Sequence, residues 1–110
     1  MNDVEIYTTP TIEGRRIREY KGLVVARNVR AVNIVRDLFT AIRDVFGGRS
    51  GSYEKVMRDI QEQAVAEIKE EARQRGANAI VGFRLDFDNI SSKGTSLLMA
   101  TASGTAVLVE

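Results

Sequence analysis

The order of hydrophobic and polar residues along the chain predicts four strands. A short β-prone segment at residues 4–9 stops before Pro10, and residues 17–26 form the first long strand. Residues 79–88 alternate between an apolar face and a polar one, which is typical of a half-buried strand. The last strand covers residues 96–109, and its middle consists almost entirely of small residues. Such a strand allows close approach by a neighbour, either a helix or another subunit.

Two helices are predicted between these strands. Apolar residues recur every three or four positions over residues 34–46 and again over residues 53–75. Asn33 suits the cap at the start of the first helix, and Gly47 suits the position after its end. Between the helices, residues 47–54 read Gly-Gly-Arg-Ser-Gly-Ser-Tyr-Glu, and the glycines permit a sharp turn. Charges of mixed sign on the outer side of the second helix indicate a solvated surface.

The predicted order is therefore strand, strand, helix, helix, strand, strand. This order indicates an α+β fold, with an antiparallel sheet and two helices packed on one face. The 110 residues suit one domain, residues 1–110. The first predicted helix is apolar over more than half its circumference, which exceeds what one sheet face covers. We therefore expect the chain to be a homo-oligomer.

Composition excludes several classes of chemistry. The chain contains no cysteine and no histidine, so it has no disulfide, Cys/His zinc site or Ser-His-Asp triad. A formal net charge of +1 indicates neither a nucleic-acid partner nor a membrane surface. Residues 1–5 do not resemble the start of a signal peptide, and no apolar run reaches the roughly 20 residues that span a bilayer. We expect a cytoplasmic protein.

Six residues in the first predicted helix and the glycine-rich turn are candidates for contact with a ligand or partner: Arg36, Asp37, Arg49, Ser50, Ser52 and Tyr53. Glycines before a helix N-terminus suit a small anion, although the lysine of a Walker motif is missing. Alternatively, the glycines only permit the turn, and Arg49 and Tyr53 hold it to a neighbour. No nucleophile accompanies the Arg36-Asp37 pair, so we expect ion pairing there and no enzyme activity.

Asp86 and Asp88 are the candidate metal ligands. They project from one face of a strand about 7 Å apart, and their oxygens suit a hard divalent cation. Alternatively, they flank Arg84 on a solvated face or pair with a neighbouring subunit. Methionines are the only sulfur donors, and Met57 lies on an apolar helix face, so no soft-metal site is expected within one subunit. A divalent cation is thus the only cofactor to consider.

Five segments, in order, resemble the YbjQ-like family of small bacterial and archaeal proteins: residues 8–14, 33–39, 42–54, 76–82 and 103–107. This resemblance implies a compact α/β subunit in a ring of five and the label of a heavy-metal-binding protein, without an established function. Two positions depart from the family pattern. Arg84 replaces the first acidic residue of a Gly-Ile-Asp-Ile-Asp-Tyr-Glu run, and Arg27 stands where an acidic residue is usual. Both changes reduce the negative charge that a cation site needs.

Together these observations predict a homo-oligomeric binding or structural protein whose partner is further copies of itself. Neither a nucleic acid nor a membrane is expected as a partner. The alternative is a protein that binds a metal through carboxylates, as the family label implies.

Overall fold

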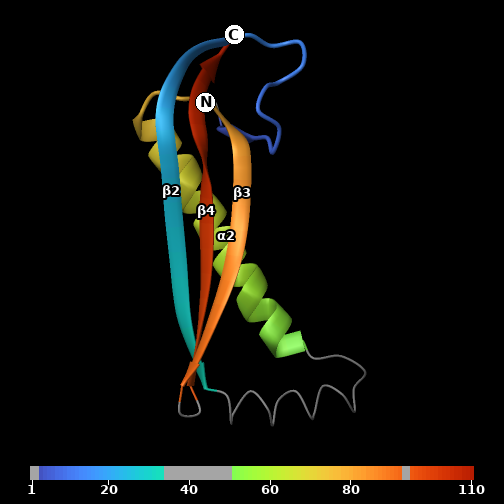
Figure 1. Ribbon diagram of the computed structural model, residues 1–110, viewed down its shortest axis with the longest axis vertical. Coiled ribbons are helices and arrows are strands. Elements are labelled where there is room, and N and C mark those ends of the chain that lie inside the picture. Colours follow the sequence, from blue (N-terminus) through green and yellow to red (C-terminus); the bar gives the residue numbers. More distant parts are fainter. Residues whose placement is uncertain (1–2, 34–50, 93–94) are drawn as a thin grey trace.

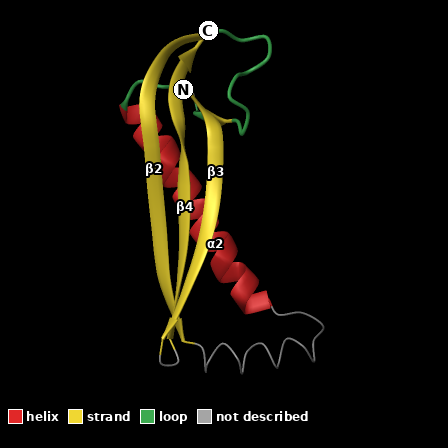
Figure 2. Cartoon of the chain, viewed as in Figure 1, coloured by secondary structure: helices red, strands yellow, loops and turns green. Residues whose placement is uncertain are grey.

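The computed structural model describes residues 3–33, 51–92 and 95–110. In chain order these residues form the elements β1 (Glu5–Ile6), β2 (Ile17–Asn33), α2 (Gly51–Gln74), β3 (Ala79–Ser92) and β4 (Thr95–Val109). Figure 1 shows three long strands side by side, with α2 crossing behind them. The described part of the chain is thus a two-layer arrangement of one helix on one sheet (Figure 2).

The strands form a single sheet in the order β1-β3-β4-β2. The central strand β4 is antiparallel to both β2 and β3 along their length. The short β1 pairs in parallel with the start of β3, through Glu5 with Ala79 and Ile6 with Ile80. The sheet is therefore mixed, and β2 forms one of its two edges.

The predicted fold is wrong in its sheet and in its helices. The sheet is mixed because β1 pairs with β3 in parallel. β1 is only two residues long, and its sequence pattern does not specify whether it pairs in parallel or antiparallel fashion. The described residues contain one helix, α2, and so run strand, strand, helix, strand, strand. The first predicted helix, residues 34–46, lies outside the described residues. The predicted ring is not visible in a single chain.

The strand β2 also extends further than its pattern predicts. It continues from residue 26 to Asn33, the residue expected to cap a helix. Residues 27–33 contain two arginines and two asparagines and show weak apolar patterning. Their strand conformation comes from pairing with β4, from Arg27 opposite Thr101 to Asn33 opposite Thr95. Tertiary hydrogen bonding therefore overrides local propensity here.

The larger core lies between α2 and the sheet, and a smaller cluster lies on the opposite face: Ile12, Ala79, Val81, Val107 and Val109. Helical residues at intervals of four pack against small residues of β4, and all seven are fully buried: Ile60, Ala64, Ile68, Ala72, Ala100, Ala102 and Ala106. The small residues of β4 therefore admit a helix of the same chain, which decides between the two expectations for that strand. No described helix is long and apolar enough to cross a membrane.

Gly104 lies at a close contact between β4 and β3. A Cβ atom at this position would lie 2.5 Å from Ile80 Cγ2 and 3.2 Å from the carbonyl oxygen of Val81. Such distances require a neighbour to move, and both neighbours belong to a packed strand. The glycine is thus a packing requirement of the β3–β4 pair.

Replacing Gly104 by alanine should lower the free energy of unfolding by about 1–3 kcal/mol, because the added methyl group overpacks the core. Urea denaturation measures the change. The matched control is Ser103→Ala, at the next, partly exposed position, where a change within about 0.5 kcal/mol is expected. An unfolding midpoint for Gly104→Ala equal to that of the wild type would contradict this account.

Candidate functional site

The sheet face opposite α2 is the first candidate surface, and we call it the uncovered face. Alternate residues of three strands lie on it: Leu23, Val25, Arg27 and Val29 from β2, Arg84, Asp86, Asp88 and Ile90 from β3, and Leu97, Met99, Thr101 and Ser103 from β4. Its apolar side chains are well exposed, with Leu23 at 65% and Ile90 at 58%. Several exposed apolar side chains on one face mark a contact site more often than apolar side chains scattered singly.

A bulge in β3 decides which residues reach the uncovered face. The strand register shifts between Val81 and Arg84, where Gly82 has a φ of 62°. Because the bulge adds a residue, Val81 and Arg84 lie on the same face. Phe83 and Leu85 instead pack toward the core under α2. The predicted apolar face of this strand is therefore wrong for Val81, which lies on the opposite side.

Asp86 and Asp88, the predicted cation ligands, both lie on the uncovered face. Arg84 Nε lies 3.1 Å and 3.0 Å from the two carboxylate oxygens of Asp86. The register also places Arg27 and Asp86 on either side of Thr101. Arg27 and Arg84 therefore share a face with the two carboxylates. Charge on this face is balanced, which disfavours a cation site.

The structure does not test the other predicted contact residues. Arg36, Asp37, Arg49 and Ser50 lie outside the described residues. Ser52 and Tyr53 follow Gly51, the first residue of α2, but their side chains are not among those described. An anion or a neighbour at this turn stays a prediction.

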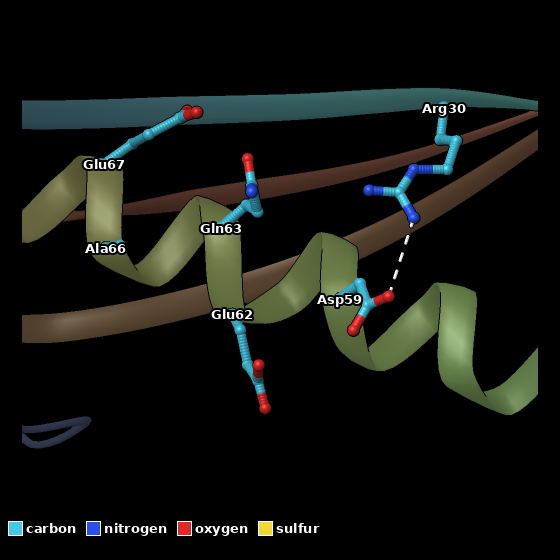
Figure 3. A pocket seen from close by; sticks show the side chains of 6 residues that line it. All are labelled: Arg30, Asp59, Glu62, Gln63, Ala66 and Glu67. Atoms are coloured by element: carbon cyan, nitrogen blue, oxygen red, sulfur yellow. Dashed lines mark ion pairs between the residues drawn. The ribbon is translucent and has the colours of Figure 1, made fainter.

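A groove between β2 and α2 is a second candidate site, which the sequence did not predict. Its volume is about 450 Å³, and its lining residues are Arg30, Asp59, Glu62, Gln63, Ala66 and Glu67. Figure 3 shows Arg30 reaching from β2 toward Asp59 on the helix, with Nη1 3.7 Å from Oδ2. The side-chain amide of Asn28 donates to Gln63 Oε1 at 3.3 Å. Three carboxylates and one guanidinium therefore line an open, acidic groove.

The sequence did not predict this groove, because its residues come together only in the tertiary structure. Its acidic residues belong to the helix surface that the sequence indicates is solvated. Asn28 and Arg30 lie beyond residue 26, where the pattern of the first long strand ends. Only the extension of β2 along β4 brings these residues opposite the helix.

Two described groups have pKa values displaced from their usual range. The Tyr7 hydroxyl donates a hydrogen bond to the Glu5 carboxylate, which raises the pKa of Tyr7. The Lys21 ammonium donates to Glu19, which lowers the pKa of that carboxyl group. Both shifts move the pKa of the group further from 7. A general acid or base works best with a pKa near the working pH.

Comparison with known proteins gives the family. The model of the YbjQ_1 family, described as "Putative heavy-metal-binding", matches residues 4–110. The chain belongs to this family. A crystal structure of a protein with unknown function in the DUF74 family, from Pediococcus pentosaceus, is similar over 97% of this chain and 98% of that chain. Its TM-score is 0.67 at 17% sequence identity, so this likeness shows the fold. The family resemblance of the sequence is confirmed.

The donor atoms of this YbjQ_1 member do not fit a soft heavy metal. Such metals prefer thiolate, thioether or imidazole ligands, and the chain has no cysteine or histidine. Met57 is partly buried and packs against the core. Within the described residues, no group of three or more His, Cys, Asp or Glu side chains is placed to hold a metal ion together. The remaining oxygen ligands suit only hard cations.

Replacing Glu5 by alanine should lower the pKa of Tyr7 toward its ordinary value. The change removes the hydrogen-bond acceptor and its negative charge, and it leaves Arg15, which favours the phenolate. NMR titration of the Tyr7 ring carbon measures the shift. Glu13→Ala, at an exposed position, is the control and should leave the titration unchanged. Identical titrations in the Glu5→Ala variant and the wild type would contradict this account.

Proposed function

We propose that this YbjQ_1 member is a non-catalytic binding or structural protein that acts as a homo-oligomer. Its copies assemble into a ring, and the number five comes from the family resemblance alone. The observation that carries the proposal is the extended subunit with its uncovered apolar face. A cytoplasmic location stays a prediction from the sequence.

The dimensions of the subunit support assembly. Its radius of gyration is 17.5 Å, whereas a compact chain of this length has about 13 Å. Its accessible surface is 7405 Å², against about 6,000 Å² for a typical monomer of this size. The excess includes apolar side chains such as Leu23, Val29 and Ile90. Contact with further copies would remove this apolar surface from water.

The chemistry of the side chains supports a non-catalytic role. The chain lacks the two residue types, Cys and His, that most often act as nucleophile and general base near neutral pH. The pKa values of Tyr7 and Glu19 are both displaced away from neutral pH. The balanced charge at Asp86 and the ion pair in the groove suit contact surfaces.

A carboxylate metal site is the alternative function. It is favoured by the family description and by the oxygen ligands of the acidic groove. Arg30 stands beside Asp59 there and opposes binding of a cation. Such a site would therefore bind a hard cation, and another subunit would have to supply the remaining oxygen ligands.

Light scattering and native mass spectrometry at micromolar concentration should find the wild-type chain as a homo-oligomer. Val29→Lys should reduce the assembled fraction without loss of helical circular dichroism, because Val29 is 53% exposed and adds little to the subunit core. The control is Thr11→Lys, at an exposed loop position, which should assemble like the wild type. A stable, folded monomer of the wild-type chain would contradict the proposed homo-oligomer.

Calorimetry with zinc, copper and cadmium should show no stoichiometric site of micromolar affinity, because the chain offers no thiolate or imidazole. Elemental analysis of the purified protein gives an independent measurement. A tight soft-metal site would contradict this expectation.

The same measurement with calcium, magnesium and manganese tests the alternative. Loss of binding in the Asp86→Asn, Asp88→Asn double variant would place a hard-cation site on the uncovered face. Loss in Asp59→Asn, Glu62→Gln would place it in the groove. No binding of any of these ions would reject the alternative.

A further inference from the structure

The sheet has two edges along which no described strand lies. β2 (Ile17–Asn33) is the last strand of the sheet, so no described strand pairs with its outer edge. At Lys21, the backbone carbonyl accepts a hydrogen bond from Arg75 Nη1. On β3, β1 covers the first residues, and the amides of Gly82 and Phe83 donate to the carbonyls of Thr9 and Tyr7. From residue 84 to residue 92, the described chain places no strand beside β3. Open edges present backbone donors and acceptors that pair readily with another strand.

The two edges carry complementary charges. On β2, Lys21 binds Glu19 and Arg30 faces Asp59 of the helix. Arg18 and Arg27 are left without an ion-pair partner among the described residues, and Arg27 is the one near the β3 carboxylates. On β3, Arg84 binds Asp86, which leaves Asp88 without an ion-pair partner in the same part of the chain. Arg27 and Asp88 both lie on the uncovered face. Each edge therefore presents a charge that the other edge can neutralise.

The strand directions select one way of joining the edges. Both β2 and β3 run antiparallel to β4, so they run parallel to each other. In a ring whose axis follows the strands, all copies point the same way, and β2 of one copy meets β3 of the next in parallel. A two-fold contact would instead pair β2 with itself in antiparallel fashion. That arrangement would bring arginines together without a carboxylate from β3.

We propose that neighbouring copies join by parallel pairing of β2 with residues 84–92 of β3 in the next copy. Arg27 then lies beside the Asp86 and Asp88 carboxylates of that copy, on the uncovered face. This inference rests on the proposed homo-oligomer and names its contact. Each junction leaves one open β2 and one open β3 at the ends of the assembly, and closure of the ring removes both.

The absence of cysteine from the chain allows a specific test by disulfide cross-linking. Within one subunit β4 separates Arg27 from Asp86 and Asp88, so the Cα atoms are about 10 Å apart, two strand spacings. A disulfide does not span more than about 7 Å. Paired strands of neighbouring copies would bring the same positions to about 5 Å. Any disulfide between these positions must therefore link two copies.

The test compares two double variants, Arg27→Cys with Asp86→Cys and Arg27→Cys with Asp88→Cys, under mild oxidation. At least one should give a ladder of covalent multimers on a non-reducing gel, because every copy contributes both cysteines. Arg27→Cys alone should remain uncross-linked. So should Arg18→Cys with Asp88→Cys, because Arg18 lies about 30 Å from Arg27 along β2.

The outcomes separate this inference from the proposed function. An oligomeric wild type with no cross-link in either double variant overturns the inference and leaves the homo-oligomer standing. Covalent dimers of the Arg27→Cys variant alone also overturn it, because they indicate the two-fold contact. A monomeric wild type rejects both proposals.

A charge exchange gives a second measurement that does not depend on cysteines. Arg27→Asp should lower the assembled fraction, and adding Asp88→Arg should restore it. Assembly of Arg27→Asp equal to that of the wild type would overturn the inference.

Discussion

The close approach of α2 to the central strand β4 is the contact on which the subunit depends. Alanines of β4 face isoleucines and alanines of the helix, and all of them are fully buried. Small residues allow the two layers to approach closely, but they remove less apolar area from water than large ones. The core that results is thin. On the opposite side of the sheet, a smaller cluster that includes Val81 and Val107 buries one end, whereas Leu23, Val29 and Ile90 stay exposed.

The unequal burial of the two sheet faces connects the fold with the proposed assembly. Among the described residues, α2 and the N-terminal segment leave part of one sheet face exposed, and no strand pairs with the outer edge of β2 or with residues 84–92 of β3. The unburied features have different chemistry: the uncovered face contributes apolar area, and the edges contribute backbone groups and unpaired charges. Parallel pairing of β2 with β3 of the next copy would satisfy the backbone groups and the charges of the edges with one repeated contact.

The same structure bears on the description of the family as heavy-metal-binding. The chain offers no soft ligands. Its carboxylates at Asp86 and Asp59 are each held by an arginine of the same subunit. Arg27 and Arg84 share the uncovered face with Asp86 and Asp88, so the charge on this face is balanced. In this chain, the balanced charge disfavours a cation on that face.

The sequence by itself determined the elements whose burial follows a simple period. The helix predicted at residues 53–75 is observed as Gly51–Gln74, and the last strand, predicted at residues 96–109, is observed as Thr95–Val109. The exclusion of cysteine and histidine chemistry also needed only composition. These features depend on residue type and spacing, which the chain carries in every conformation.

The tertiary structure decided the features that depend on a partner strand. Pairing with β4 extended β2 to Asn33 through polar residues, and the bulge at Gly82 moved Val81 to the opposite face from Phe83. Parallel pairing of β1 made the sheet mixed. The juxtaposition of Arg27 with the β3 carboxylates likewise exists only in the register across β4. Hydrogen bonding between distant segments sets such relations, because alternation along one strand specifies neither its neighbour nor its direction.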